Sequence, residues 1–126
     1  MSRKLMSLGD RGEELAAGFL RDNGYKIISR KYKVKLGEID IVALDKDVLC
    51  FVEVKARRSI KFGSGKEAVF GRKQRQISKV ALNFIKENSC LNKKSRFDVV
   101  SVDFSSIKPR LDLVKDAFEL SGEFTY

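Results

Sequence analysis

Two apolar runs near the middle of the chain constrain its fold most strongly. Residues 36–44 and 48–57 are separated only by the polar break Asp45-Lys46-Asp47. Such a short break between two extended runs favours a tight antiparallel connection. Both faces of the runs are apolar near this break, as in central strands that are covered on both sides. The pattern therefore predicts a β-hairpin inside an α/β protein.

The remaining elements follow from the spacing of apolar residues. Helical spacing predicts helices over residues 8–23 and 67–87. Extended patterns predict further strands over residues 25–34, 97–104 and 111–120. The expected order is α-β-β-β-α-β-β, a mixed β-sheet flanked by helices. The length, with no linker or repeat, indicates a single domain over residues 1–126.

The charge of the chain indicates its class of partner. Its 26 Lys and Arg residues outnumber its 17 Asp and Glu residues, which gives a formal net charge of +9. Such an excess favours a polyanion, and nucleic acid is the leading candidate. The sequence contains neither an apolar span of about 18 residues nor an N-terminal signal-peptide pattern. We therefore expect a cytoplasmic protein that does not bind membranes.

The absence of histidine narrows the possible chemistry. The chain contains no His, which excludes Ser-His-Asp and Cys-His nucleophilic sites and zinc centres built on imidazole. Cys50 and Cys90 show neither CxxC spacing nor a paired framework, so both are expected to be thiols. Any catalysis must then use carboxylates, lysine, tyrosine or backbone groups.

The predicted hairpin brings acidic residues together. Side chains alternate between the two faces of a strand, so each run presents every second residue to one face. In the first run one face carries Glu38, Asp40, Val42 and Leu44, and the other carries Ile39, Ile41 and Ala43. In the second run Leu49, Phe51, Glu53, Lys55 and Arg57 share a face. Pairing Leu44 with Leu49, and Val42 with Phe51, places Asp40 opposite Glu53 and Glu38 opposite Lys55.

Two carboxylates in this position require an explanation. At about 5 Å and an effective dielectric constant of about 20, they repel by roughly 3 kcal/mol. A hard divalent cation removes this penalty, and oxygen ligands suit magnesium. Lys55 could then orient an attacking water or neutralise a phosphate. The alternative is an ionic network of Glu53 and Lys55 with Glu38 and Arg57, with Asp40 as an ordinary acid.

These residues resemble a known nuclease motif. Asp40 followed on the next strand by Glu53-Val54-Lys55 is similar to the PD-(D/E)XK nuclease superfamily, although Ile39 replaces the proline. More narrowly, the chain resembles the uncharacterised bacterial YraN-like family. The motifs that carry this resemblance are GxxGE at 9–13, GEIDIVA, FVEVKAR, a following helix with Lys73, and RFDVV at 96–100. The resemblance implies a restriction-endonuclease-like core.

The resemblance also implies roles for individual residues. Asp40, Glu53 and the Val54 carbonyl would bind Mg²⁺, with Mn²⁺ as a substitute, and Lys55 would assist the nucleophilic water. Glu13 matches an acid on the first helix that often completes such sites. Its position beside the apolar face of the helix lets it reach inward, but an ordinary solvated acid fits equally well.

Further residues are candidates for contact with nucleic acid. Lys73 lies on the inward line of the second helix, where it could meet a phosphate or simply cover apolar surface. Gln76 is a lesser candidate near the edge of the same stripe. The basic residues that could follow a phosphate backbone are Arg57, Arg58, Lys61, Lys66, Arg72 and Lys73. Asp98 is expected to form a structural salt bridge, with Arg57 as the suggested partner.

The function expected from these features is metal-dependent endonuclease activity that hydrolyses phosphodiester bonds in DNA. The fold of the family resembles that of archaeal Holliday-junction resolvases, which suggests branched DNA and a homodimer by analogy. The alternative is a catalytically silent nucleic-acid-binding protein with a nuclease fold. A third possibility is a protein-interaction adaptor whose charge only aids solubility.

Overall fold

A computed structural model of the chain describes residues 5–58 and 71–118, except for the side chains of residues 71–73 and 118. The helices and strands follow the predicted order α-β-β-β-α-β-β. They are α1 (Leu8–Asp22), β1 (Lys26–Val34), β2 (Gly37–Asp45), β3 (Val48–Arg57), α2 (Gly71–Glu87), β4 (Ser95–Asp103) and β5 (Arg110–Phe118). The parts of the expected elements at residues 67–70 and 119–120 lie outside the described residues.

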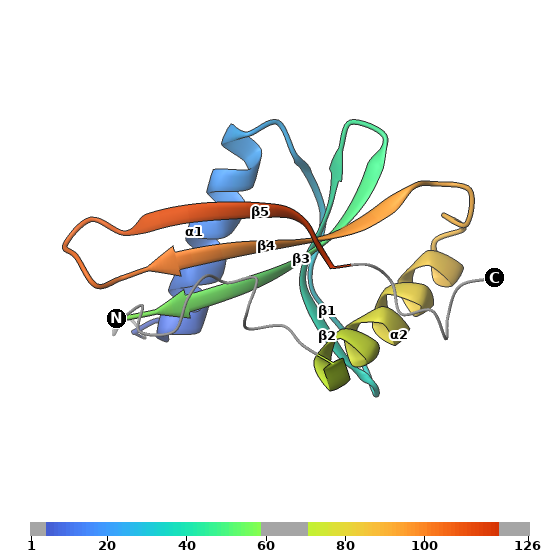
Figure 1. Cartoon of the computed structure of the whole chain (residues 1–126), viewed down its shortest axis with the longest axis horizontal. Coiled ribbons are helices and arrows are strands. Elements are labelled where there is room, and N and C mark those ends of the chain that lie inside the picture. The colour runs from blue at the N-terminus through green and yellow to red at the C-terminus, as the bar shows by residue number, and fades with distance from the viewer. Residues whose placement is uncertain (1–4, 59–70, 119–126) are drawn as a thin grey trace, which may run out of the picture.

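The strands form one mixed sheet in the order β1-β2-β3-β4-β5. β3 and β4 are parallel, whereas the other neighbouring pairs are antiparallel. A parallel pair needs a long crossover connection, and α2 lies in the segment that connects β3 to β4. The two helices lie on opposite sides of the sheet (Figure 1). The predicted fold class is thereby confirmed.

Each helix covers its own core. The core beneath α1, between this helix and the sheet, includes the side chains of Leu20, Ile41, Val52, Val100 and Val102. The core beneath α2 includes those of Val42, Phe51, Val80, Phe84 and Val99. Because neighbouring residues of β2, β3 and β4 enter different cores, these strands are apolar on both faces. This double coverage explains the continuous apolar runs in the sequence.

α1 lies unusually close to β3 at one point. A Cβ atom added at Gly12 would lie 2.6 Å from the Cβ of Ala56, so only a glycine lets the two backbones approach this far. Ser7 begins the helix, because its Oγ accepts a hydrogen bond from the Asp10 N–H at 3.0 Å. The close contact places the next residue of the helix, Glu13, against the sheet.

β2 does not keep one orientation along its length. Ile39 packs into the core beneath α2, whereas Ile41 packs into the core beneath α1. The prediction that these two residues share a face was therefore wrong for Ile39. The neighbouring strand is also irregular, since Lys31 has φ +54 and the register shifts between Ile27 and Ser29. The strand changes face at the position between the isoleucines, which is Asp40.

Candidate active site

The paired part of β2 and β3 ends just before Asp40 and Glu53. Their ladder includes Leu44 with Leu49 and Val42 with Phe51, as predicted, and its last pair is Ile41 with Val52. One step beyond that pair, the Asp40 side chain takes the place of a ladder hydrogen bond. Its Oδ2 accepts the backbone N–H of Val54 at 2.8 Å. We call Asp40, Glu53 and Lys55 at this point the acidic fork.

The two acids of the fork face a common cleft. Asp40 and Glu53 line a cavity of about 280 Å³. Its other walls are Gly37 and Glu38 from β2 and Gln76, Ile77 and Val80 from α2. The expected meeting of Asp40 with Glu53 is therefore present in the structure. Gln76, expected only as a lesser candidate, also borders this cleft.

Asp40 is electrostatically strained in this position. Burial raises the pKa of Asp40 to about 7, and the nearby charges of Glu53, Glu13 and Glu38 act in the same direction. The hydrogen bond from the Val54 N–H acts in the opposite direction and lowers this pKa. The ionised carboxylate is thus poorly compensated by the protein alone. A positive charge bound in the cleft would stabilise it.

Lys55 lies beside the second acid. Its Nζ is 3.5 Å from Glu53 Oε1, and the two side chains are only 20% and 13% exposed. This contact matches part of the ionic network that was the alternative interpretation. Asp40, however, is not the ordinary acid that this alternative requires, because its pKa is raised. The fork therefore combines an ion pair with a second, poorly compensated carboxyl group.

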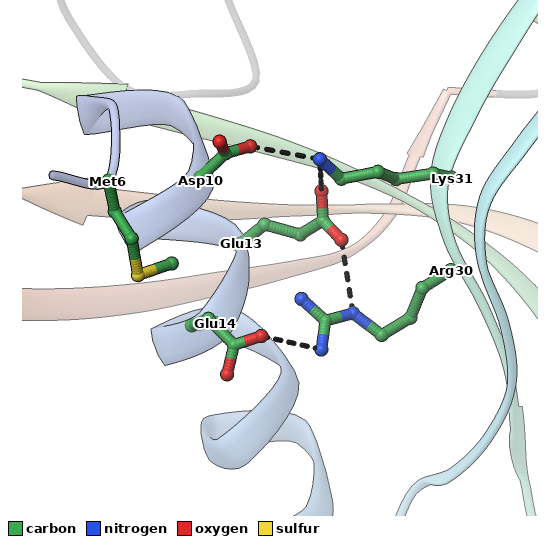
Figure 2. A pocket seen from close by; sticks show the side chains of 6 residues that line it. All are labelled: Met6, Asp10, Glu13, Glu14, Arg30 and Lys31. Atoms are coloured by element: carbon green, nitrogen blue, oxygen red, sulfur yellow. Dashed lines mark hydrogen bonds and ion pairs between the residues drawn. The ribbon is translucent and has the colours of Figure 1, made fainter. Parts of the chain in front are cut away.

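Glu13 is not a solvated acid, since it is 6% exposed. Figure 2 shows it pointing from α1 towards two basic residues of β1. Its Oε1 is 3.0 Å from Arg30 Nε, and its Oε2 is 3.9 Å from Lys31 Nζ. Arg30 also binds Glu14 at 2.8 Å, and Lys31 binds Asp10 at 2.9 Å. These residues and Met6 line a second cavity, of about 320 Å³.

Arg30 was missed by the sequence analysis. It lies opposite Ile41 in the β1–β2 ladder, one position from Asp40 along β2. Its side chain fixes the carboxylate of Glu13, whose charge acts on Asp40. The register of β1 against β2 would have shown that Arg30 lies next to Asp40. The shift in that register between Ile27 and Ser29 makes it hard to find from alternation alone.

The donors of the fork fit a magnesium ion. In residues 5–58 and 71–118 no group of three or more His, Cys, Asp or Glu side chains could hold a metal ion. Magnesium, however, is commonly bound through one or two carboxylates, with water and substrate phosphates completing its shell. Asp40 and Glu53 would supply two such ligands, and the carbonyl of Val54, the residue after Glu53 on β3, would offer a further oxygen.

The basic candidates are only partly described. Arg57 is half-buried and Arg58 is exposed at the end of β3. Lys61 and Lys66 lie outside the described residues. For Arg72 and Lys73 the structure places the backbone in the first turn of α2, but not the side chain. Their predicted contact with nucleic acid stays a prediction.

Asp98 forms a structural salt bridge, but with a different partner from the one suggested. The completely buried carboxylate binds Arg96 Nε at 2.9 Å rather than Arg57. It also accepts hydrogen bonds from the Tyr25 hydroxyl and the Asp116 N–H, both at 2.9 Å. Arg96 is two residues before Asp98 on β4, which begins at Ser95, whereas the predicted strand began at residue 97 and left Arg96 out. This cluster lies apart from the acidic fork.

The fold and the fork define the class of this protein. A five-stranded mixed sheet between two helices, with an acid on β2 and Glu-x-Lys on β3, is consistent with a restriction-endonuclease-like core. Residues 12–102 match the family model described as "Uncharacterised protein family UPF0102". The chain therefore belongs to the UPF0102 family, which is the YraN-like family indicated by its motifs.

Several relatives resemble the chain over nearly its whole length. A "UPF0102 protein" of Syntrophus aciditrophicus is 44% identical over 113 residues, which cover 90% of this chain and 89% of the relative. One from Geobacter metallireducens is 45% identical over 121 residues, 96% of this chain and 99% of the relative. One from Caldicellulosiruptor saccharolyticus is 45% identical over 113 residues, 88% and 96% of the two chains. Their names assign no activity.

The electrostatic coupling around Asp40 can be tested directly. Glu53→Gln should lower the pKa of Asp40 more than Glu13→Gln does, because Glu53 is the stronger of the two charged neighbours. Titration of the Asp40 carboxyl carbon by NMR measures both shifts, with Glu87→Gln at the end of α2 as the control. An Asp40 pKa that is unchanged in the Glu53 variant would refute the proximity of the two acids.

Proposed function

We propose that this protein is a metal-dependent endonuclease that hydrolyses phosphodiester bonds in DNA. The acidic fork supports this proposal most directly. It joins a half-buried Asp40, whose pKa is raised to about 7, to Glu53 and Lys55 on the neighbouring strand. The formal net charge of +9 favours a polyanionic substrate. A structural ionic network gains nothing from a poorly compensated acid, whereas a cation site needs one.

Each residue of the fork has a role in this proposal. Asp40 and Glu53 would hold Mg²⁺, with Mn²⁺ as a substitute, and the Val54 carbonyl would add a third oxygen. When bound, the cation supplies a Lewis acid that stabilises negative charge on the phosphate. The Val54 N–H keeps the Asp40 carboxylate oriented. Lys55 holds the attacking water or a phosphate oxygen near Glu53.

The protein is proposed to act in the cytoplasm. In the described part of the chain, no helix is long and apolar enough to cross a membrane. Cys50 and Cys90 are both free thiols, as they would remain in a reducing compartment. Branched DNA as a substrate, and a homodimer as the active form, are further proposals that rest on the resemblance to resolvases.

Magnesium binding should become tighter as the pH rises through about 7. Asp40 must lose its proton before it can bind the cation, and its pKa is raised to about 7. Below that pH the apparent affinity should fall by up to about tenfold per pH unit. Isothermal titration with MgCl₂ and with MnCl₂ at several pH values measures this. An affinity that does not change between pH 6 and pH 8 would argue against Asp40 as a ligand.

The accompanying activity assay uses four DNA substrates: linear duplex, flapped, single-stranded and four-way junction. Cleavage of at least one of them with Mg²⁺, and its loss with a chelator, is the expected result. A wild-type protein that is inert on all four with both Mg²⁺ and Mn²⁺ would count against the proposal.

The second candidate is a silent nucleic-acid-binding protein. The observation that favours it is the contact of Lys55 with Glu53, which already compensates one of the two acids without a metal. This candidate predicts DNA binding that weakens with salt but does not respond to chelator. Filter binding with and without EDTA separates the two candidates.

A further inference from the structure

We propose that the tip of the β1–β2 hairpin, residues 33–37, binds unpaired nucleotides of the substrate beside the cleft. The protein would then prefer DNA with single-stranded or forked parts over continuous duplex. This inference rests on the proposed function, because it assumes a nucleic-acid partner. We call residues 33–37 the hairpin tip.

The hairpin tip borders the cleft of the acidic fork. Residues 35 and 36 form the turn between β1 and β2, and Gly37 and Glu38, directly after the turn, line the cleft that contains Asp40 and Glu53. The tip lies beside α2 in Figure 1, at the lower end of the teal hairpin. A strand bound in the cleft would therefore lie close to the tip.

The tip is held in place by α2. The Gln76 side-chain amide donates a hydrogen bond to the carbonyl of Leu36. Gly37 has φ +149, a conformation that favours glycine, and a Cβ atom there would lie 3.0 Å from Gln76 Nε2. The backbone of the turn is therefore fixed against the helix. A preorganised element loses less conformational entropy when it binds a ligand.

The side chains of the tip suit a nucleic acid. Leu36 is 51% exposed although it is apolar, and Lys33 and Lys35 on either side of Val34 are exposed. Lysines bind phosphates through their charge, and an exposed leucine can insert against a base that is free of its stack. Glu38 lies opposite Lys33 in the ladder, so one acid is next to these lysines.

The pattern fits unpaired nucleotides better than a protein partner. A single exposed leucine next to two lysines is far too small for a stable protein interface, which buries about 800 Å² on each side. Bases in continuous duplex are stacked, and separating them costs a few kcal/mol per step. Bases in a single strand or at a fork expose their faces without that cost. The leucine would therefore discriminate unpaired DNA from continuous duplex, whereas the lysines would bind the phosphates of both.

Binding without metal tests the inference separately from cleavage. Fluorescence anisotropy in EDTA would compare single-stranded, forked and duplex DNA of one sequence. Leu36→Ala should weaken binding of the first two by about tenfold and leave duplex binding unchanged. Leu91→Ala is the matched control, because Leu91 is an exposed leucine, at 70%, in a turn after α2. Thermal unfolding confirms that both variants fold.

The lysines should behave differently. Lys33→Gln with Lys35→Gln should weaken binding of all three DNAs and reduce the slope of log K against log salt by up to about 1.8 on duplex. The matched control is Lys26→Gln with Lys94→Gln, which also removes two exposed lysines. Lys26 is at the start of β1, at the end of the β1–β2 hairpin away from the tip, and Lys94 directly precedes β4, where its carbonyl accepts the Leu49 N–H.

The possible failures are distinguishable. If Leu36→Ala has no more effect than Leu91→Ala, or weakens all three DNAs equally, the role of the tip is overturned while DNA binding stands. A wild-type protein with equal affinity for forked and duplex DNA overturns it as well. A wild-type protein that binds no DNA overturns the proposed function itself.

Discussion

Asp40→Asn should abolish magnesium-dependent DNA cleavage and, at the same time, stabilise the metal-free protein above pH 7. The loss of activity, about a thousandfold or more, is expected because an amide cannot replace a charged ligand or neutralise the cation. The gain in stability follows from the raised pKa of Asp40. The asparagine oxygen can still accept the Val54 N–H, so the strand contact is retained.

The pH dependence of this gain has a definite sign. Asp40 has a pKa of about 7 in the folded protein, against 3.8 for an unperturbed aspartate. Its ionisation therefore costs the folded state stability, and this cost grows from about pH 4 to about pH 7 and is constant above. The difference in unfolding free energy between Asp40→Asn and wild type should follow the same course. Urea denaturation at pH 5, 6, 7 and 8 without metal measures it.

Asp45 provides a matched control on the same strand. Its hydrogen bond from Arg96 lowers the pKa of Asp45, so its ionised form stabilises the fold. Asp45→Asn should then destabilise the protein at pH 8, which is the opposite sign to Asp40→Asn. If Asp40→Asn also destabilised the protein at pH 8, the raised pKa of Asp40 would be disproved.

Gly12→Ala should destabilise the protein by about 1–3 kcal/mol. The added methyl group would lie 2.6 Å from the Cβ of Ala56, and both atoms are attached directly to packed backbone. α1 must move away from β3, which also displaces Glu13. Chemical denaturation with urea measures the loss in unfolding free energy.

Gly18→Ala in the same helix is the control. A Cβ atom at Gly18 meets nothing within 4 Å, so this change should stabilise α1 by about 0.5–1 kcal/mol. Both substitutions add one methyl group to the same helix, so they differ in the contacts that this methyl group makes with Ala56 and Phe104. If both variants were stabilised, α1 would not be held as close to β3 as the structure indicates.

The fold was largely predictable because its strongest signals are local. Apolar spacing indicated both helices, and the short break at residues 45–47 indicated the hairpin. The register of that hairpin followed from pairing Leu44 with Leu49, since a shift by one residue would turn apolar side chains to the wrong face. The meeting of Asp40 with Glu53 was a consequence of that register.

What could not be predicted depends on irregular backbone and on distant contacts. The change of face between Ile39 and Ile41 breaks the alternation from which strand faces are inferred. The contact of Arg30 with Glu13 joins an irregular strand to a helix 17 positions away. The pairing of Asp98 with Arg96 depends on how Tyr25 and Asp45 surround the arginine. None of these leaves a periodic signal in the sequence.

The hydrogen bond between Asp40 and Val54 has a consequence for how this family can diverge. The side chain that would carry the reactive charge also serves as a backbone acceptor, and an amide performs the second task without the first. A single Asp40→Asn substitution would therefore remove the proposed hydrolysis and leave the fold intact or more stable. Family members that bind nucleic acid without cleaving it would then arise by a single substitution, and their fold would not distinguish them from active members.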